Sequence, residues 1–261
     1  MIHPFEYRRR AFKTLALAAA LSLLASACGR PPDQPAEAAR PAAKAGLTNT
    51  KYTAAEFDAI ARRVFAPIYP YLARQVKQDL GISSGRAVDA GCGPGYWALA
   101  LAQETNLQVT ALDLDPDALA IVRRNVAAAG LEGRVEAVQG DVQKMPFPDG
   151  YADLVVSRGS YPFWKDKVQA FREIKRILKP GGVAFIGGGL GSLLPVEERE
   201  RIRTIMDNEK IGPPKELEVS FEDMSRILRE AGIPVFKIAH DEGCLCGLWV
   251  EFRKPAGPGL R

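Results

Sequence analysis

Three glycines at alternate positions are the feature of the sequence that points most directly to chemistry. Gly91, Gly93 and Gly95 lie in the string VDAGCGPGYW, between an apolar segment and a segment with helical periodicity. At such a turn the backbone can lie flat against a ligand, because any Cβ would intrude. A dinucleotide fingerprint reads G-x-G-x-x-G, but Tyr96 stands where its third glycine belongs. No G-K-S/T follows, and Pro94 removes a backbone N–H, so the turn suits phosphate poorly.

Acidic residues end the next two expected strands. Asp113 ends one, and Asp141 with Val142 follows the other. The carboxyl ends of neighbouring parallel strands share one edge of a sheet, where Asp113 can accept hydrogen bonds from both ribose hydroxyls. The carboxylate of Asp141 and an adjacent backbone N–H can read the amine and ring nitrogen of adenine. Taken singly, each acid is equally a solvated strand-end or turn residue. Their coincidence with the glycine turn favours an adenosine that carries a small, non-phosphate substituent.

Short apolar segments alternate with amphipathic ones along the chain. Asp115, Pro116 and Gly130 have the residue types of the N-cap, the first position and the C-terminal stop of a helix. This alternation predicts an α/β fold whose largely parallel sheet is covered on both faces and closed by an antiparallel hairpin. The expected strands are 86–90, 108–112, 135–139, 152–157, 183–186, 235–239 and 248–252. The expected helices are 57–64, 71–80, 96–104, 116–129, 165–178, 196–208 and 221–231.

Four motifs between Arg86 and Ile186 occur in a family's order and spacing: VDAGCGPGYWALALA, ALDLDPDAL, GDVQKMPFPDGYADLVVS and ILKPGG. With them the chain resembles the class I S-adenosylmethionine-dependent methyltransferases. The resemblance implies a three-layer, Rossmann-like, doubly wound sheet of seven strands, in the order 3-2-1-4-5-7-6 with strand 7 antiparallel. It also implies S-adenosyl-L-methionine as the cofactor.

The resemblance further implies where the cofactor would lie. Asp89, Gly91 and Gly93 would flank its methionine portion, Asp113 would hold the ribose, and Asp141 with Val142 would hold the adenine. The complete set of expected cofactor-binding residues is Asp89, Gly91, Gly93, Gly95, Asp113, Leu114, Asp141, Val142 and Ser157.

Residues after the fourth strand of this family usually face the transferred methyl group. An N-P-P-Y/F motif is absent there, which argues against the amino-methyltransferases of adenine and glutamine. Arg158 and Tyr161 are the candidate catalytic residues, and the acceptor is expected to be an unidentified small molecule. Arg158 would bind an anionic substrate or the cofactor carboxylate, or form a structural ion pair. Tyr161, Phe163 and Trp164 would form an aromatic wall that excludes water, or pack in the core.

Two cysteines near the end of the chain, Cys244 and Cys246, would point to the same side of an extended segment. They are a candidate soft-metal pair, a methyl-accepting thiol, a redox pair, or two small packed side chains. Two thiols do not complete a zinc site, so no bound metal is expected. His240, beside two acids, is a candidate base or a surface histidine.

Composition excludes some classes of protein. The 261 residues include 35 Lys and Arg against 31 Asp and Glu, and most of the excess lies in the first 27 residues. The remainder is nearly neutral, so a nucleic-acid partner is not expected. The composition predicts no particular oligomeric state.

The N-terminus has the features of an export signal. Residues 1–28 combine a basic stretch that partly matches a twin-arginine signal, a 14-residue uncharged run, and small residues before Cys28. Cys28 resembles a lipobox cysteine, which would become a lipid anchor at the membrane. Residues 29–47, rich in Pro and Ala, are expected to form a tether to a domain at 48–261. The expected location is the cell envelope, or the cytoplasm if the start is misassigned.

Two other functions compete with a methyltransferase. An anchored protein that binds an adenosine compound or a thiol ligand without turnover would agree with export, because the cofactor is made in the cytoplasm. A nicotinamide-dependent oxidoreductase is disfavoured by Tyr96 in the glycine motif.

The lipobox interpretation predicts that cells expressing the chain incorporate radiolabelled fatty acid into it. Cys28→Ala removes the thiol that would carry the lipid, so label should be lost. Label that persists in this variant would reject the lipid anchor.

Overall fold

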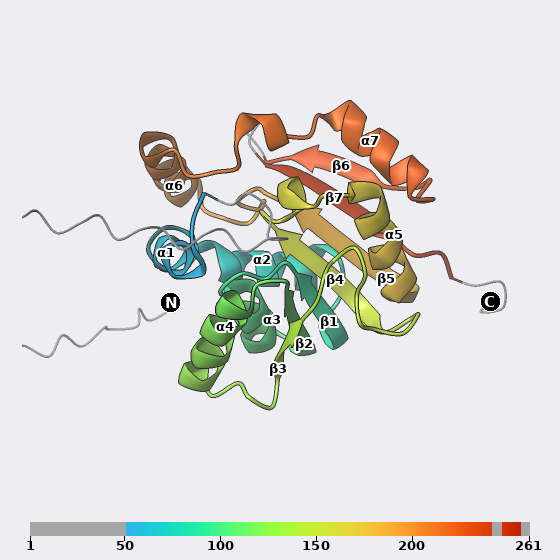
Figure 1. The fold of residues 1–261 in the computed structure, drawn as a ribbon, viewed down its shortest axis with the longest axis horizontal. Coiled ribbons are helices and arrows are strands. Elements are labelled where there is room, and N and C mark those ends of the chain that lie inside the picture. The colour runs from blue at the N-terminus through green and yellow to red at the C-terminus, as the bar shows by residue number, and fades with distance from the viewer. Residues whose placement is uncertain (1–50, 242–246, 257–261) are drawn as a thin grey trace, which may run out of the picture. The chain divides into compact units, whose positions relative to one another are not determined.

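The computed structural model describes residues 51–241 and 247–256. The expected signal, Cys28, the tether up to residue 47, Cys244 and Cys246 lie outside them. Seven strands form one sheet in the order β3-β2-β1-β4-β5-β7-β6 (Figure 1). Strand β7 runs antiparallel to both β5 and β6, and the remaining neighbours are parallel. The predicted fold class is confirmed. The strands are β1 (Ser84–Ala90), β2 (Asn106–Asp113), β3 (Val135–Gln139), β4 (Ala152–Arg158), β5 (Leu178–Gly187), β6 (Lys237–His240) and β7 (Leu248–Arg253).

Helices cover both faces of this sheet. The helices are α1 (Ala54–Ile60), α2 (Ile68–Asp79), α3 (Tyr96–Glu104), α4 (Pro116–Ala129), α5 (Lys167–Ile177), α6 (Val196–Glu209) and α7 (Phe221–Glu230). Three shorter elements are the π-helix η1 (Ala61–Phe65) and the 3-10 turns η2 (Tyr161–Phe163) and η3 (Lys215–Leu217). Side chains alternate along each strand, so Ala87 and Leu154 pack with α2, α3 and α4, whereas Val88 and Val155 pack with α5 and α7. Among the described residues, no helix combines the length and apolar character that a membrane span requires.

Most element boundaries shift by one to three residues from the sequence-based expectation, and two of the differences have a clear local cause. The helix expected from residue 71 begins at Ile68, with Pro67 as its N-cap and Pro70 in its first turn. Proline is tolerated there because the first turn has no intrahelical acceptor for its missing N–H. Strand β5 begins at Leu178 and not at Val183, because Leu178 already pairs with β4 ahead of an irregularity in the register.

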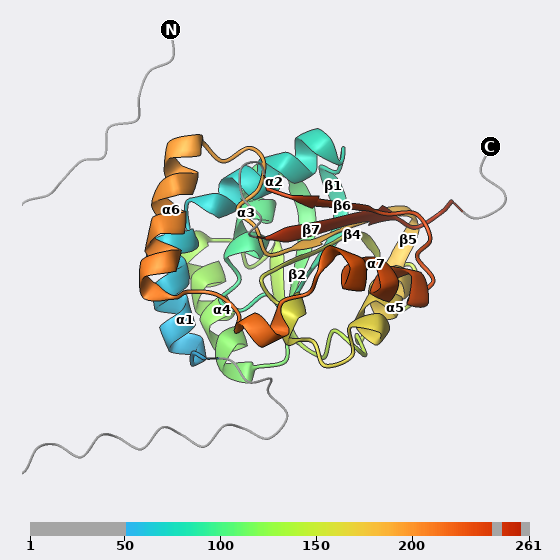
Figure 2. The ribbon, with the colours of Figure 1, turned by 90° about the horizontal axis from the view of Figure 1, so that it is seen from above.

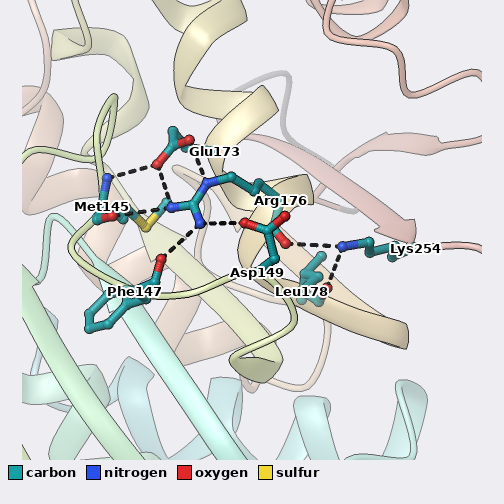
Figure 3. Close-up of polar contacts among 7 residues, drawn as sticks. All are labelled: Met145, Phe147, Asp149, Glu173, Arg176, Leu178 and Lys254. Carbon is teal, nitrogen blue, oxygen red and sulfur yellow. Dashed lines mark hydrogen bonds and ion pairs between the residues drawn. The ribbon is translucent and has the colours of Figure 1, made fainter.

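Arg176 connects α5 to the loop that follows β3 (Figure 3). Its guanidinium donates to the carbonyl oxygens of Met145 and Phe147 at 3.1 and 2.8 Å. It also pairs with Glu173 and Asp149, each at 2.8 Å. The hydrogen bond from Arg176 lowers the pKa of Glu173, whose side chain is only 12% exposed. One side chain therefore holds the loop that begins at Asp141.

Removing this clamp should destabilise the fold. We expect Arg176→Ala to lower the free energy of unfolding by about 2–3 kcal/mol, because it leaves Glu173 without its cation and two carbonyl groups without a donor. Urea unfolding would measure the change. Arg201→Ala, which breaks an ion pair with Glu198 that lies nearer to solvent, should cost about 0.5 kcal/mol or less. Equal losses in the two variants would contradict a clamp at Arg176.

Candidate functional site

The glycine turn after β1 is tied to the neighbouring strand. The N–H groups of Gly91 and Cys92 donate to the Leu112 carbonyl of β2 at 2.8 and 3.0 Å. Gly91, Gly93 and Gly95 have φ values of +72°, +52° and +81°, a region that L side chains rarely adopt. A Cβ on Gly91 would also overlap the Ser160 hydroxyl. Glycine is therefore required here both by backbone conformation and by space.

Asp113 and Asp141 lie at neighbouring strand ends. The residue before Gly140 pairs with Asp113 in the sheet, and the Gly140 N–H donates to the Asp113 carbonyl at 3.0 Å. The Asp113 carboxylate accepts from the N–H groups of Gly93 at 2.8 Å and Asp115 at 2.9 Å, while burial raises its pKa. Each of its oxygens keeps a lone pair for a further donor. Three of the predicted features, the turn and the two acids, thus meet on one edge of the sheet.

The residues expected at the adenine end of the site are Asp141, Val142 and Leu114. Asp141 accepts hydrogen bonds from the backbone and the side chain of Gln143, at 2.8 and 3.0 Å. Val142, next to it, is buried, and Leu114 lies exposed after β2. This edge therefore offers an anchored carboxylate beside an apolar side chain.

Asp89 is a buried carboxyl group with unmet hydrogen-bonding capacity. It is 2% exposed, and burial raises its pKa to about 7, with the charge of Asp113 adding to the effect. Within the described residues its Oδ2 atom has no hydrogen-bond partner. The buried hydroxyl of Ser157, on the adjacent strand β4, also lacks a partner there. Unsatisfied buried polar atoms are rare in folded proteins, and two on neighbouring strands indicate a place for polar ligand atoms. A ligand ammonium would fit Asp89.

Arg158 lies at the end of β4 among aromatic rings. Its Nε donates to the Gly189 carbonyl at 2.8 Å, and its guanidinium stands 4.5 Å from the ring centre of Phe65 and 5.7 Å from that of Tyr69. Among residues 51–241 and 247–256, no carboxylate forms an ion pair with it. The arrangement leaves guanidinium donors for an anionic group and does not contain the ion pair that the sequence left open.

The expected aromatic wall is partly a core feature. Tyr161 is buried, and burial with a contribution from Glu218 raises its pKa to about 12. Trp164 is also buried, donates to the Ser160 hydroxyl at 2.9 Å, and packs edge-on against Phe171 of α5. Phe163 is half-buried. Tyr161 is thus a phenol that can donate a hydrogen bond at neutral pH.

The N-terminal helices supply residues that the sequence analysis did not assign to the site. The ring of Phe57 in α1 lies 3.4 Å from the point that a Cβ on Gly93 would occupy. Phe65 and Tyr69 follow in η1 and α2, against Arg158. Their helical spacing was the available signal, but it is equally the spacing of core residues. His240, in contrast, is exposed, and Cys92 is a thiol whose pKa burial raises.

Comparison with known proteins identifies the family. The profile described as "Methyltransferase domain" matches residues 88–186. A protein of Methanococcus maripaludis, provisionally named an S-adenosyl-L-methionine-dependent methyltransferase, is 37% identical over 82% of this chain and all of that one, with a TM-score of 0.70. The chain belongs to the S-adenosylmethionine-dependent methyltransferases. Its fold and motifs are those that the sequence predicted for this family.

The curated relatives align over a shorter segment. The rice (Oryza sativa subsp. japonica) protein 2-methyl-6-phytyl-1,4-hydroquinone methyltransferase 1 is 38% identical over 40% of this chain and 30% of its own length. The uncharacterized methyltransferase YdaC of Bacillus subtilis is 33% identical over 41% of this chain and 59% of its own. The matched region is thus less than two thirds of either relative.

Because the pKa of the buried Asp89 carboxyl is raised, we expect the free energy of unfolding of the ligand-free protein to depend on pH. Its pKa rises from 3.8 to about 7 on folding, so the folded state holds the proton more tightly between these values. The free energy of unfolding should therefore fall as pH rises through this window, by about 1.4 kcal/mol per unit at most from this group. Asp89→Asn cannot ionise and should be more stable than the parent protein at pH 8. Thermal unfolding from pH 5 to 8 measures this, and parallel curves for the two proteins would contradict it.

Proposed function

We propose that the chain transfers a methyl group from S-adenosyl-L-methionine to a small-molecule acceptor. The observation that carries this proposal is the buried Oδ2 atom of Asp89, which has no hydrogen-bond partner among the described residues and lies two residues before a glycine turn held by Asp113. A cofactor with a cationic amine and a neutral linker to adenosine suits this combination better than a nucleotide, whose phosphates would lie against buried acids.

The residues of one edge fit successive parts of that cofactor. Asp141 and Val142 would hold the adenine, and Asp113 the ribose hydroxyls. Asp89 would receive the ammonium group of the methionine end, and its charge would then be paired. Arg158 is available for the methionine carboxylate or for an anionic group of the acceptor. Gly91, Gly93 and Gly95 keep the backbone close, and Leu114 and Ser157 border the site.

When bound, the cofactor supplies a methyl group on a sulfonium, which a nucleophile displaces in line. The protein's part is then to align the acceptor and to keep out water. Tyr161 stays protonated at neutral pH, so it can orient an acceptor by donating a hydrogen bond but does not serve as the base. The rings of Phe65 and Tyr69 lie against the Arg158 guanidinium.

The identity of the acceptor is the least constrained part of the proposal. The rice relative is named for a hydroquinone, and ajmaline N-methyltransferase of Rauvolfia serpentina, 34% identical over 38% of this chain, is named for ajmaline. Both names are those of organic compounds and not of a protein or nucleic acid, which supports a small-molecule acceptor here. We also propose a location in the cell envelope, on the export features of residues 1–28 alone.

Cofactor binding predicts a selective gain in thermal stability. S-adenosylmethionine or its demethylated product, S-adenosylhomocysteine, at about 100 times the dissociation constant should add about 2.7 kcal/mol to the free energy of unfolding, and NAD should add nothing. Asp113→Ala should abolish the gain, whereas Glu132→Ala, an exposed acid in the loop between α4 and β3, should keep it. Melting curves with millimolar compound test both statements.

Each negative result has its own meaning. If neither sulfur compound shifts the melting temperature of the parent protein, the proposed function is wrong. If Asp113→Ala responds as the parent does, only its ribose role is wrong. A stabilising cofactor with no methyl transfer to any acceptor would favour a binding protein without turnover.

A further inference from the structure

Asp58 in α1 is a second buried carboxylate, and it belongs to no part of the site described above. It is 4% exposed, yet it accepts hydrogen bonds from three side chains. The Tyr96 hydroxyl donates at 2.8 Å, Arg124 at 2.7 Å and Arg62 at 2.5 Å. Burial opposes ionisation, but the hydrogen bonds from Arg124, Tyr96 and Arg62 prevail and lower the pKa of Asp58.

These partners bring three helices together at the glycine turn. Tyr96 is the first residue of α3 and directly follows Gly95. Arg124 is in α4, whose next residue, Asn125, donates to the Pro94 carbonyl within the turn at 3.0 Å. Asp58 therefore fixes α1 to both helices that border the turn.

The attachment of α1 by Asp58 also affects the site, because the preceding residue, Phe57, contacts the glycine turn. Phe57 places its ring against Gly93, 3.4 Å from the point that a Cβ on this glycine would occupy. The position of that ring depends on where α1 is held. Figure 2 shows α1 beside α4, with α6 running alongside. Ala55, Asp58, Arg62, Ile121 and Arg124 help to line an open hollow of about 500 Å³ between α1 and α4, so solvent reaches the network from outside.

A second line of contacts runs from Tyr96 to the other end of the site. The Tyr96 ring stacks on Tyr69, with centroids 6.0 Å apart and planes inclined by 21°. Tyr69 is one of the two rings beneath the Arg158 guanidinium. Asp58 thus contacts none of the residues that would touch the cofactor. It orients Tyr96, whose ring stacks on Tyr69, and the Tyr69 ring in turn lies against Arg158.

We propose that Asp58 is a positioning residue for cofactor binding. Acting through Tyr96, it holds Phe57 over the glycine turn and the Tyr69 ring against Arg158. This rests on the proposed function, because it concerns the same cofactor. The charge of Asp58 is what the arrangement needs, since two guanidinium groups and a hydroxyl all donate to it. A neutral amide at this position cannot satisfy all three donors.

The test measures the dissociation rate and dissociation constant of S-adenosylhomocysteine in stopped-flow and titration experiments, beside the melting temperature without ligand. Asp58→Asn should speed dissociation at least tenfold and weaken binding to match. Tyr96→Phe keeps the ring stack but removes the hydroxyl, and it should show a smaller loss of the same kind. The control, Glu209→Gln, removes a carboxylate that pairs with Arg63 of η1 away from the turn, and both constants should stay within twofold of the parent values.

The double variant decides whether Asp58 acts through Tyr96. If it does, Asp58→Asn with Tyr96→Phe should dissociate ligand no faster than Asp58→Asn alone. Multiplied effects would overturn the path through Tyr96. A lower melting temperature with unchanged dissociation in Asp58→Asn would overturn the positioning role and leave a purely structural anchor. If Asp58→Asn does not fold, an unchanged dissociation rate in Tyr96→Phe overturns the proposal. A parent protein that binds no S-adenosylhomocysteine would instead refute the proposed function.

Discussion

The site depends on an imbalance of charge at the carboxyl edge of the sheet. Asp89 is buried and Asp113 is half-buried, and the charge of Asp113 adds to the raised pKa of Asp89. Asp113 is compensated by two backbone N–H groups, whereas one oxygen of Asp89 has no partner in the described part of the chain. An uncompensated buried carboxyl lowers stability, and the cationic amine of the proposed cofactor would supply the missing positive charge. The glycine turn and Arg158 belong to the same expected site as the Asp89 carboxyl.

The strand order places the Asp89 carboxyl at a position in the sheet that a ligand can reach. Strand β1 lies between β2 and β4, and the chain crosses from one side of β1 to the other at this point. The crevice at such a reversal lies outside the carboxyl ends of the strands and is not covered by a connecting helix. Here the N-terminal elements α1, η1 and α2 place Phe57 beside Gly93, and Phe65 and Tyr69 beside Arg158. On the other face, Arg176 fixes the loop that carries Asp141.

The fold alone does not determine the reaction. The [4+2]-cyclase SpnF has the same fold at a TM-score of 0.54, with 19% identity over 79% of this chain and 98% of its own. The match to the family profile ends at Ile186, so α6, η3 and α7 lie outside it. Glu218, the residue directly after η3, also lies outside the matched segment, and it contributes to the raised pKa of Tyr161.

The sequence by itself determined the sheet and the family, and it predicted which residues would line the cofactor edge. Glycine spacing, strand-end acids and helix caps are local signals, and local signals survive without knowledge of packing. Helix 116–129 was predicted to the residue because Asp115 and Gly130 mark its two ends, and the predicted helix 96–104 begins directly after Gly95. Tertiary structure alone decided which distant groups became partners. Two such arrangements join segments far apart in the chain: the attachment of Asp58 to Tyr96 and Arg124, and the rings of Phe65 and Tyr69 against Arg158. The lack of a partner for the Asp89 Oδ2 atom among the described residues is likewise a result of packing. A buried carboxylate has the same sequence signature as an exposed one, because burial and pairing are properties of the neighbours that folding supplies.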